Sequence, residues 1–392
     1  MAQTADVVII GGGVTGTSLA YHLADRGVKN IVVVEKKFLA AGGTGHSVGI
    51  IRQLYPTREA RQMVLRSLRV FQHFRELIGG ESGYVGCGAL IGISKVMLPT
   101  LRRSMETQAE LGIRAEVLTP EEAHRIEPRI DPEGVAGLLY EPESGYGDPT
   151  GVTLGYARAA RDRGVRIEQG VEVTAIRVAG SRVLGVDLAS GESVDAPVIV
   201  NAAGLWACFV ARFAHVELPI VVGRHPVFVV RRPPDFGAAH PVYLDLAGGT
   251  YVKPELGDLT LTGSLTEDEA RHPMDPERLG GGVSFEEAAL ALERTSRAVP
   301  SLASGAYQRG YAGAFDITPD WMPILDESPV KGFYVAAGFS GHGFKLAPAV
   351  GEMMAELITS GRTTINRAPF RLDRFTEGRP ARSSFVSSYL AP

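Results

Sequence analysis

The sequence predicts an α/β protein in which a nucleotide-binding domain with a parallel, Rossmann-type sheet is joined to an α+β domain with a large antiparallel sheet. Three observations support this prediction. An apolar run at residues 6–10 leads directly into Gly11-x-Gly13-x-x-Gly16, a spacing typical of strand–turn–helix units that bind dinucleotides. Two more apolar runs, at residues 197–204 and 333–338, also end in glycine. Residues 221–265 contain short strand-like runs at close spacing, which favours antiparallel sheet.

The first strand–turn–helix unit predicts a nucleotide site. Gly11 permits the tight turn, Gly13 lets the backbone approach a pyrophosphate, and Gly16 lets the helix pack on the strand. Residues 31–34 form the next strand, and Glu35 at its end is placed to accept hydrogen bonds from a ribose hydroxyl. The other residues of this unit that we expect at the cofactor are Val14, Thr15 and Lys36.

The remaining elements follow from apolar periodicity. Residues 36–55 are rich in glycine and irregular, and residues 165–187 suggest paired strands around the turn Gly180-Ser181. Strands and helices alternate between residues 84 and 140. Helices are predicted at residues 18–27, 58–78, 151–163, 285–299 and, from about Leu346, 346–360.

Parallel-type strands occur at both ends and in the middle of the chain, so both domains are predicted to be discontinuous. We assign residues 1–80, 147–220 and 315–368 to the nucleotide-binding domain, and residues 81–146 and 221–314 to the second domain. Residues 369–392 form a polar tail, rich in Arg and Ser, that we expect to pack loosely.

Composition excludes several classes of protein. Forty basic and 44 acidic residues give a net charge of −4, so nothing favours binding to nucleic acid. The longest apolar run, residues 205–211, is far shorter than the roughly 20 residues that span a membrane. Two cysteines and the lack of a signal-peptide pattern suggest the cytoplasm. The nine histidines show no ligand spacing, so we expect no metal.

The cofactor is predicted to be FAD rather than NAD. Only one nucleotide fingerprint is present, and it is followed by a glycine-rich loop instead of regular βαβ units. Later apolar strands end at Ala203-Gly204 and Gly338, as expected if an extended FAD is held across two domains. The loop residues expected at the cofactor are Thr44, Gly45, His46 and Ser47.

A second turn, residues 339–345, lies between a strand and a helix. A helix N-terminus here would stabilise negative charge on a reduced flavin ring. Gly341 and Gly343 would let the backbone approach the ring, and Lys345 would bind an anionic group of the substrate. The alternative is that Lys345 is a solvated lysine and His342 a capping residue.

These motifs resemble the D-amino-acid oxidase superfamily of FAD-dependent oxidoreductases, and most closely its sarcosine oxidase group. The resemblance runs from about residue 5 to 370 and rests on residues 9–16 (IIGGGVTG), 49–55 (GIIRQLY) and 336–345 (AAGFSGHGFK). It implies an FAD-binding domain and a substrate domain. It also implies oxidation of a secondary, N-methyl amino acid such as sarcosine to an imine, with O2 reoxidising the flavin and giving H2O2.

The resemblance also implies residue roles. Arg52 and Lys345 match the positions that bind the substrate carboxylate, and two cations in a dry pocket can fix one carboxylate. Tyr251 matches a pocket tyrosine, and we include His342 among the catalytic residues. An ion pair of Arg52 with Glu59, or simple packing of Tyr251, is the competing interpretation. Further expected contacts to FAD are Val173, Ala203, Gly204, Gly313, Gly338, Gly341, Gly343 and Phe344.

Three departures from the family pattern matter. No cysteine lies near Thr318-Pro319-Asp320, so a cysteinyl link to FAD is excluded. His46 matches a histidine that bonds covalently to the flavin in dimethylglycine dehydrogenase-like relatives, so both a covalent link and a hydrogen bond stay open. The lysine that activates O2 is missing from residues 259–263, and Lys253 is the nearest in sequence.

The departures leave rival functions. One is a proline- or dimethylglycine-type dehydrogenase, and another is the flavin-bearing β-subunit of a hetero-oligomeric oxidoreductase. In each case we expect a small amino acid as substrate, no nucleic acid and no membrane as partner, and a monomer or small oligomer.

Overall fold

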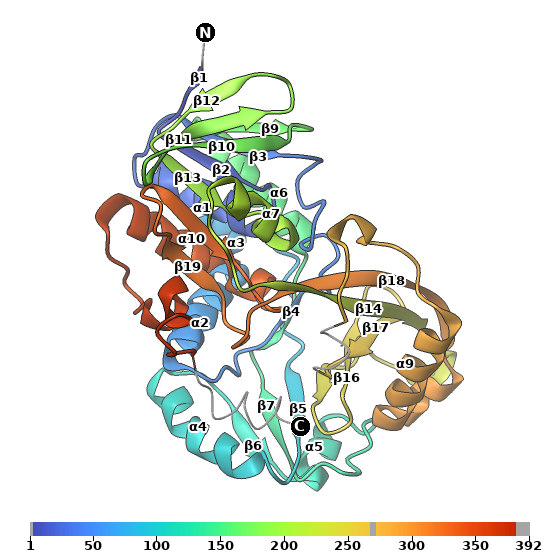
Figure 1. The fold of residues 1–392 in the computed structure, drawn as a ribbon. Coiled ribbons are helices and arrows are strands. Elements are labelled where there is room, and N and C mark those ends of the chain that lie inside the picture. Colours follow the sequence, from blue (N-terminus) through green and yellow to red (C-terminus); the bar gives the residue numbers. More distant parts are fainter. Residues whose placement is uncertain (1–2, 267–271, 382–392) are drawn as a thin grey trace.

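The computed structural model describes residues 3–266 and 272–381. Figure 1 shows a parallel sheet at the N-terminal end of the molecule and a larger sheet beside and below it. The long strands β14 (Val221–Arg231) and β18 (Ala306–Ile317) extend from the first region into the second. The predicted α/β fold class is confirmed.

The first sheet has the strand order β19-β20-β13-β2-β3-β9. All neighbours are parallel except the edge strand β19, which is antiparallel to β20. Strands from four distant parts of the sequence therefore lie side by side. They are β2 (Val7–Ile10), β3 (Ile31–Glu35), β9 (Arg166–Gln169), β13 (Val198–Asn201), β19 (Ile324–Glu327) and β20 (Phe333–Ala337).

The inner strands β20, β13, β2 and β3 are buried on both faces, which explains why they are nearly continuous apolar runs. Val7 and Ile9 of β2 point into a core shared with α1 (Val14–Asp25), α2, α6 and α10. Val8 and Ile10 point the other way, against a four-stranded sheet and α7. That smaller sheet consists of β1 (Gln3–Thr4), β12 (Ser193–Asp195), β11 (Arg182–Leu188) and β10 (Val173–Ala179).

The larger sheet has eight strands in the order β18-β14-β17-β16-β15-β5-β7-β6, and only the pair β15–β5 is parallel. It is therefore mixed but mostly antiparallel, as predicted. Its strands are β5 (Ala89–Ile93), β6 (Glu116–Leu118), β7 (Gly137–Glu141), β14 (Val221–Arg231), β15 (Val242–Asp245), β16 (Thr250–Pro254), β17 (Leu259–Ser264) and β18 (Ala306–Ile317). A short ribbon, β4 (Ile50–Ile51) with β8 (Gly145–Tyr146), lies between the two regions.

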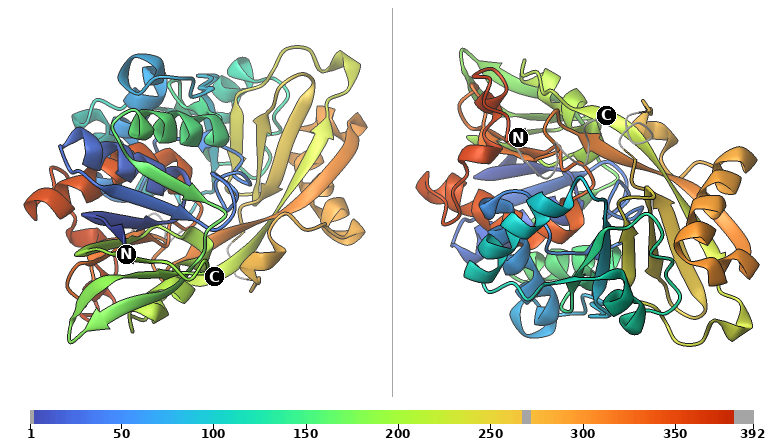
Figure 2. Two further views of the ribbon diagram at one scale, coloured as in Figure 1. Left: turned by 90° about the horizontal axis from the view of Figure 1, so that it is seen from above. Right: turned by 90° about the horizontal axis from the view of Figure 1, so that it is seen from below.

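Helices cover the outer surfaces of both sheets. Figure 2 shows α9 on the face of the larger sheet that is turned away from the parallel sheet. The remaining helices are α2 (Arg58–Gln72), α3 (Phe74–Leu77), α4 (Leu98–Glu110), α5 (Pro120–Ile126), α6 (Pro149–Arg161), α7 (Ala207–Phe213), α9 (Phe285–Ala298) and α10 (Gly343–Ser360). Within the part of the chain that the structure describes, no helix has the length and apolar character needed to cross a membrane.

Three element boundaries differ from the prediction. The first helix spans Val14–Asp25 rather than residues 18–27, because Thr15, Gly16 and Thr17 in its first turn interrupt the apolar pattern. The helix predicted over residues 58–78 is broken at His73, whose ψ of 29° ends α2 before α3 begins. The last helix begins at Gly343 rather than near Leu346, because Gly343 and Lys345 on either side of Phe344 interrupt the apolar pattern from which a helix start is predicted. The limits proposed above for the two domains remain a prediction.

The expectation of a loosely packed tail is wrong at Phe370 and Arg374, whereas residues 376–379 are exposed. Phe370 is fully buried, and the guanidinium of Arg374 is buried in an ion pair with Asp320. Arg374 is one of the arginines that suggested a solvated tail, and it anchors this segment to the rest of the protein. Residues 382–392 lie outside the described part of the chain.

Gly16→Ala is expected to destabilise the protein by about 2–3 kcal/mol, because a Cβ at this position would lie 2.0 Å from the carbonyl oxygen of Gly11. The free energy of unfolding in urea measures this cost. Gly27→Ala is the control. A Cβ there meets nothing within 4 Å, and only the positive φ of 88° costs about 1 kcal/mol. Equal losses for the two variants would contradict close packing of the helix on the turn.

Candidate active site

A cavity of about 400 Å³ lies where the parallel sheet meets the larger sheet. Its lining comes from the carboxyl ends of β2, β3 and β13, from the loop after β3, and from the start of α10. The larger sheet contributes residues of β14, β16 and β18. The three segments that the sequence assigns to a nucleotide site therefore share one cavity.

The glycine turn forms one end of the cavity. Gly13, Val14 and Thr15 line it, and the N-cap residue Gly13 has no side chain that could cap the helix starting there. The Oγ1 of Thr44 accepts a hydrogen bond from the N–H of Val14 at 3.2 Å, which fixes the following loop to the turn. An uncapped helix N-terminus favours a phosphate group.

Glu35 lies at the same end. Its carboxylate accepts hydrogen bonds from the N–H of Gly12 at 2.7 Å and from the N–H of Lys37 at 2.8 Å. Each carboxylate oxygen has a second lone pair, so the group can still accept a ribose hydroxyl. The backbone bonds hold it in place for that contact.

Lys36 lines the cavity but makes contacts that the sequence did not predict. Its ammonium pairs with Glu277 and lies 4.0 Å from the centre of the Trp206 ring. The indole N–H of Trp206 donates to Glu277 at 2.6 Å. In sequence, Glu277 lies between strands β17 and β18 of the larger sheet, so this cluster joins the two regions beside the nucleotide end.

His46 lies on the loop between the two ends of the cavity. Its Nδ1 is 3.0 Å from the carbonyl oxygen of Gly42, which can only accept, so Nδ1 carries the proton. Its Nε2 faces the backbone of Gly280, because a Cβ built there would lie 2.8 Å away. The ring also packs edge-on against Tyr311.

Arg52, His342 and Lys345 gather at the opposite end of the cavity. The guanidinium of Arg52 donates to the carbonyl oxygen of Leu54 and lies over the ring of Tyr55 at 4.9 Å. The ammonium of Lys345, in the first turn of α10, donates to the carbonyl oxygen of Gly341 at 3.1 Å. His342 packs edge-on against Tyr55 at 5.2 Å. The expected pair of cations is therefore present at one site.

Burial changes the titration of this cluster. Desolvation and the nearby Arg52 charge hold the pKa of Lys345 well below its usual range. Desolvation, with Lys345 and Arg52, likewise lowers the pKa of His342, so its imidazole is neutral. Burial raises the pKa of Tyr55. Among the described residues, Nδ1 of His342 and the hydroxyl of Tyr55 have no hydrogen-bond partner.

The wall from the larger sheet carries Tyr251 and His225. Tyr251 on β16 is buried, and its hydroxyl is 3.3 Å from Nε2 of His225 on β14. The His225 ring stacks on Phe315 at 4.1 Å. Burial raises the pKa of Tyr251 well above its ordinary value, so its hydroxyl stays protonated.

Lys253 does not line the cavity. Its ammonium is 2.7 Å from a carboxylate oxygen of Glu255 and lies over the ring of Tyr146 at 4.1 Å. Although Lys253 is two residues from Tyr251 on the same strand, its ammonium is paired with Glu255 outside the cavity.

Three predicted cofactor contacts lie behind the lining. Besides Gly16, these are Gly45 and Gly338, where a Cβ would meet the carbonyl oxygen of Ala40 at 2.5 Å and the Cγ2 of Thr318 at 2.5 Å, respectively. These three glycines therefore pack against neighbouring protein atoms and do not line the cavity. The other predicted site residues line the cavity: Gly11, Gly13, Val14, Thr15, Glu35, Lys36, Thr44, His46, Ser47, Arg52, Val173, Ala203, Gly204, Tyr251, Gly313, Gly341, His342, Gly343, Phe344 and Lys345.

An extended dinucleotide fits these residues. One end offers an uncapped helix N-terminus and an acidic side chain, and the other offers cations, a second uncapped helix start and two buried polar atoms in need of partners. The sequence matches the family model described as FAD dependent oxidoreductase over residues 6–357. The chain belongs to this family. The resemblance to the D-amino-acid oxidase superfamily is therefore confirmed, and the family supports FAD as the cofactor.

This FAD-dependent oxidoreductase is similar to several known proteins. It is 30% identical over 386 residues to mitochondrial sarcosine dehydrogenase of Homo sapiens, covering 96% of the chain and 42% of that protein. It is 28% identical over 377 residues to 4-methylaminobutanoate oxidase (formaldehyde-forming) of Paenarthrobacter nicotinovorans, covering 94% and 45%. The chain thus spans less than half the length of these two relatives.

Two solved structures share the fold over nearly the whole chain. L-proline dehydrogenase from P. horikoshii is 27% identical with a TM-score of 0.88, covering 97% of this chain and all of the other. Glycine oxidase from Geobacillus kaustophilus is 26% identical with a TM-score of 0.81, covering 95% and 99%.

Sequence reasoning missed His225, Tyr55 and Glu277. His225 lies in an ordinary strand pattern, and only its alignment with Tyr251 across the sheet brings it to the cavity. Tyr55 closes the stretch that carries Arg52, so its position was a usable signal. No sequence signal pointed to Glu277, because its ion pair with Lys36 joins residues that are 241 positions apart.

Proposed function

We propose that this oxidoreductase oxidises a secondary, N-methyl amino acid such as sarcosine to an imine, with O2 accepting the electrons and giving H2O2. The supporting observation is that Arg52 and Lys345 line one cavity and interact electrostatically. Two cations at a buried site require an anion, and a carboxylate beside an amine supplies it. Bound FAD supplies the two-electron oxidation of the carbon–nitrogen bond.

The residues of the cavity would prepare the substrate for this step. Arg52 and Lys345 bind the carboxylate, and their charges disfavour a protonated amine nearby, so the neutral amine is bound. Tyr251 stays protonated and donates a hydrogen bond from the opposite wall, and His225 orients its hydroxyl. His342 adds no charge. The chain needs no nucleophile, because the cofactor performs the chemistry.

The second candidate is a dehydrogenase that passes electrons to another acceptor. Two observations favour it: strand β17 contains no lysine, and Lys253 is paired with Glu255 outside the cavity. The L-proline dehydrogenase with the same fold supports it as well. A β-subunit of a hetero-oligomer is a form of this candidate, and the mass and activity of the purified chain would test it.

Peroxide release separates the two candidates. The purified chain is mixed with sarcosine in air, and peroxide and the flavin spectrum are recorded in one cuvette. We expect catalytic peroxide. Bleached flavin with little peroxide, together with rapid dye reduction, would contradict the oxidase and support the dehydrogenase.

We further infer that FAD is bound without a covalent link to His46. The Nδ1 of His46 donates to Gly42, and its Nε2 faces the backbone of Gly280. Acid denaturation of the holoenzyme is expected to release all yellow colour into the supernatant, and His46→Ala is expected to weaken FAD retention only. Flavin absorbance that stays with the precipitated chain, and is lost in His46→Ala, would show a histidyl link.

A further inference from the structure

Two turns at the cavity have strained backbones. Trp321 and Ser340 both line the cavity and have φ values of 60° and 51°. Residues other than glycine rarely adopt this left-handed region, and they do so where the surrounding structure holds them. The groups that hold these two turns therefore shape the cofactor site.

Hydrogen bonds tie the two turns together. The N–H of Thr318 donates to the Oγ of Ser340 at 3.2 Å, and the two hydroxyls are 3.4 Å apart. Ser340 and Gly338 also donate backbone N–H groups to Asp316, at 2.9 Å and 2.8 Å. The loop that leads to Lys345 is thus bonded to the end of β18 and the turn after it.

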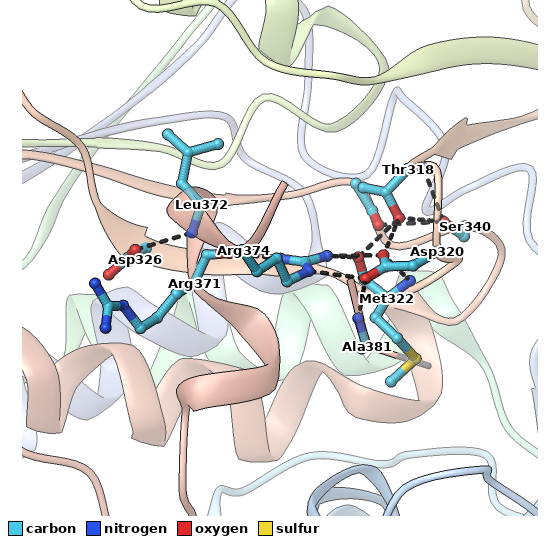
Figure 3. A network of polar contacts seen from close by, with 10 residues as sticks. Thr318, Asp320, Met322, Asp326, Ser340, Arg371, Leu372, Arg374 and Ala381 are labelled. Carbon is cyan, nitrogen blue, oxygen red and sulfur yellow. Dashed lines mark hydrogen bonds and ion pairs between the residues drawn. The ribbon is translucent and has the colours of Figure 1, made fainter. Parts of the chain in front are cut away.

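The C-terminal segment holds the turn that follows β18 (Figure 3). Arg374 binds the carboxylate of Asp320 with two hydrogen bonds of 2.9 Å, and it donates a third, of 2.7 Å, to the carbonyl oxygen of Met322. Asp320 also accepts from the hydroxyl of Thr318 at 3.2 Å and from the N–H of Ala381 at 2.7 Å. The two charged side chains are 2% and 5% exposed.

Arg374 does not line the cavity, and it lies beyond the residues that match the family model. It reaches the site through Asp320, Thr318 and Ser340. A buried ion pair is costly to break, because loss of either partner leaves an uncompensated charge. The pair therefore fixes both strained turns from the side away from the cavity.

We propose that Arg374 is a positioning residue for the cofactor: it holds the turns at Trp321 and Ser340 in the conformation that binds the flavin. The proposal rests on the proposed function only in requiring FAD in this cavity. It assigns to the C-terminal segment a role in cofactor binding.

The test compares Arg374→Lys with Arg367→Lys. Lysine keeps the charge but loses the paired bonds to Asp320 and the bond to Met322. Arg367 anchors the same segment through Asp326 on β19, without contact to the turn, and is the matched control. Release of FAD from diluted holoenzyme gives the dissociation constant, and visible circular dichroism of the bound flavin reports its surroundings.

Arg374→Lys is expected to weaken FAD binding roughly tenfold, as for loss of one charge-assisted hydrogen bond, and to alter the flavin dichroism. Arg367→Lys is expected to leave both unchanged. Equal behaviour of the two variants, with a wild-type flavin spectrum, would overturn the proposal alone. A wild-type chain that binds no FAD would instead contradict the proposed function.

Thr318→Val keeps the test decisive if Arg374→Lys does not fold. It removes the hydroxyl that contacts Met322, Asp320 and Ser340, and it retains the shape of a buried side chain. We expect the same spectral change, and we expect the double variant to be no weaker than the weaker single variant. Wild-type FAD binding in Thr318→Val, or strictly additive losses, would overturn the proposal.

Discussion

Replacing Arg52 with alanine is expected to raise the KM for the amino acid substrate by roughly 30- to 100-fold, with a smaller effect on kcat. The reason is the loss of a charge-assisted hydrogen bond to the substrate carboxylate, which contributes about 2–3 kcal/mol at a buried site. Tenfold in affinity corresponds to about 1.4 kcal/mol. Arg52→Lys is expected to fall between wild type and alanine, because lysine keeps the charge but cannot bind both carboxylate oxygens.

Steady-state kinetics with one secondary amino acid measures this effect. Arg58→Ala is the control, because Arg58 forms an exposed ion pair with Glu110 on the outer surface. Its KM should match wild type. If Arg52→Ala changes the KM less than about threefold, equivalent to under 1 kcal/mol, the carboxylate assignment is wrong.

Lys345 is expected to make the binding of carboxylates depend on pH. Burial and the Arg52 charge lower its pKa well below the usual value for lysine. The charged ammonium is the form that binds a carboxylate, so affinity is full below this lowered pKa and falls as the pH rises through it. His342 stays neutral and Tyr55 stays protonated, so neither of these neighbours produces the same transition.

A simple carboxylate such as propionate, used as a competitive inhibitor, avoids titration of the substrate amine. Lys345→Met should bind it at least about tenfold more weakly below the transition and show no transition, as for loss of one charge-assisted bond. Lys345→Arg should bind it without pH dependence. Lys253→Met removes a buried lysine outside the cavity and should keep the wild-type profile. A transition that survives in Lys345→Met would have to come from another group.

The nucleotide half of the site was predictable because its signals are local. The turn from Gly11 to Gly16 joins a strand to a helix within one stretch, and Glu35 follows at the end of the next strand. These residues need only backbone geometry to meet, so spacing alone brings most of them to one cavity. The glycines that lie behind the lining could not be told from those that face it, because that depends on their packing partners.

The substrate half was less predictable because it is assembled from distant strands. The family resemblance supplied Arg52 and Tyr251, and it supported the role that the turn at residues 339–345 had already suggested for Lys345. His225 meets Tyr251 only through the pairing of β14 and β16 with β17. Arg374 was misjudged, since a sequence rich in Arg and Ser resembles a solvated tail, and its partner Asp320 lies 54 residues earlier.

The most direct test of the proposed function is anaerobic reduction of the bound flavin. The holoenzyme is mixed with sarcosine or L-proline, and in parallel with dimethylamine or pyrrolidine, which lack the carboxylate. We expect the visible flavin absorbance to bleach with at least one of the amino acids and to stay unchanged with the two amines. Bleaching by the amines alone, or no bleaching by any secondary amino acid, would contradict oxidation of such a substrate at the site formed by Arg52 and Lys345.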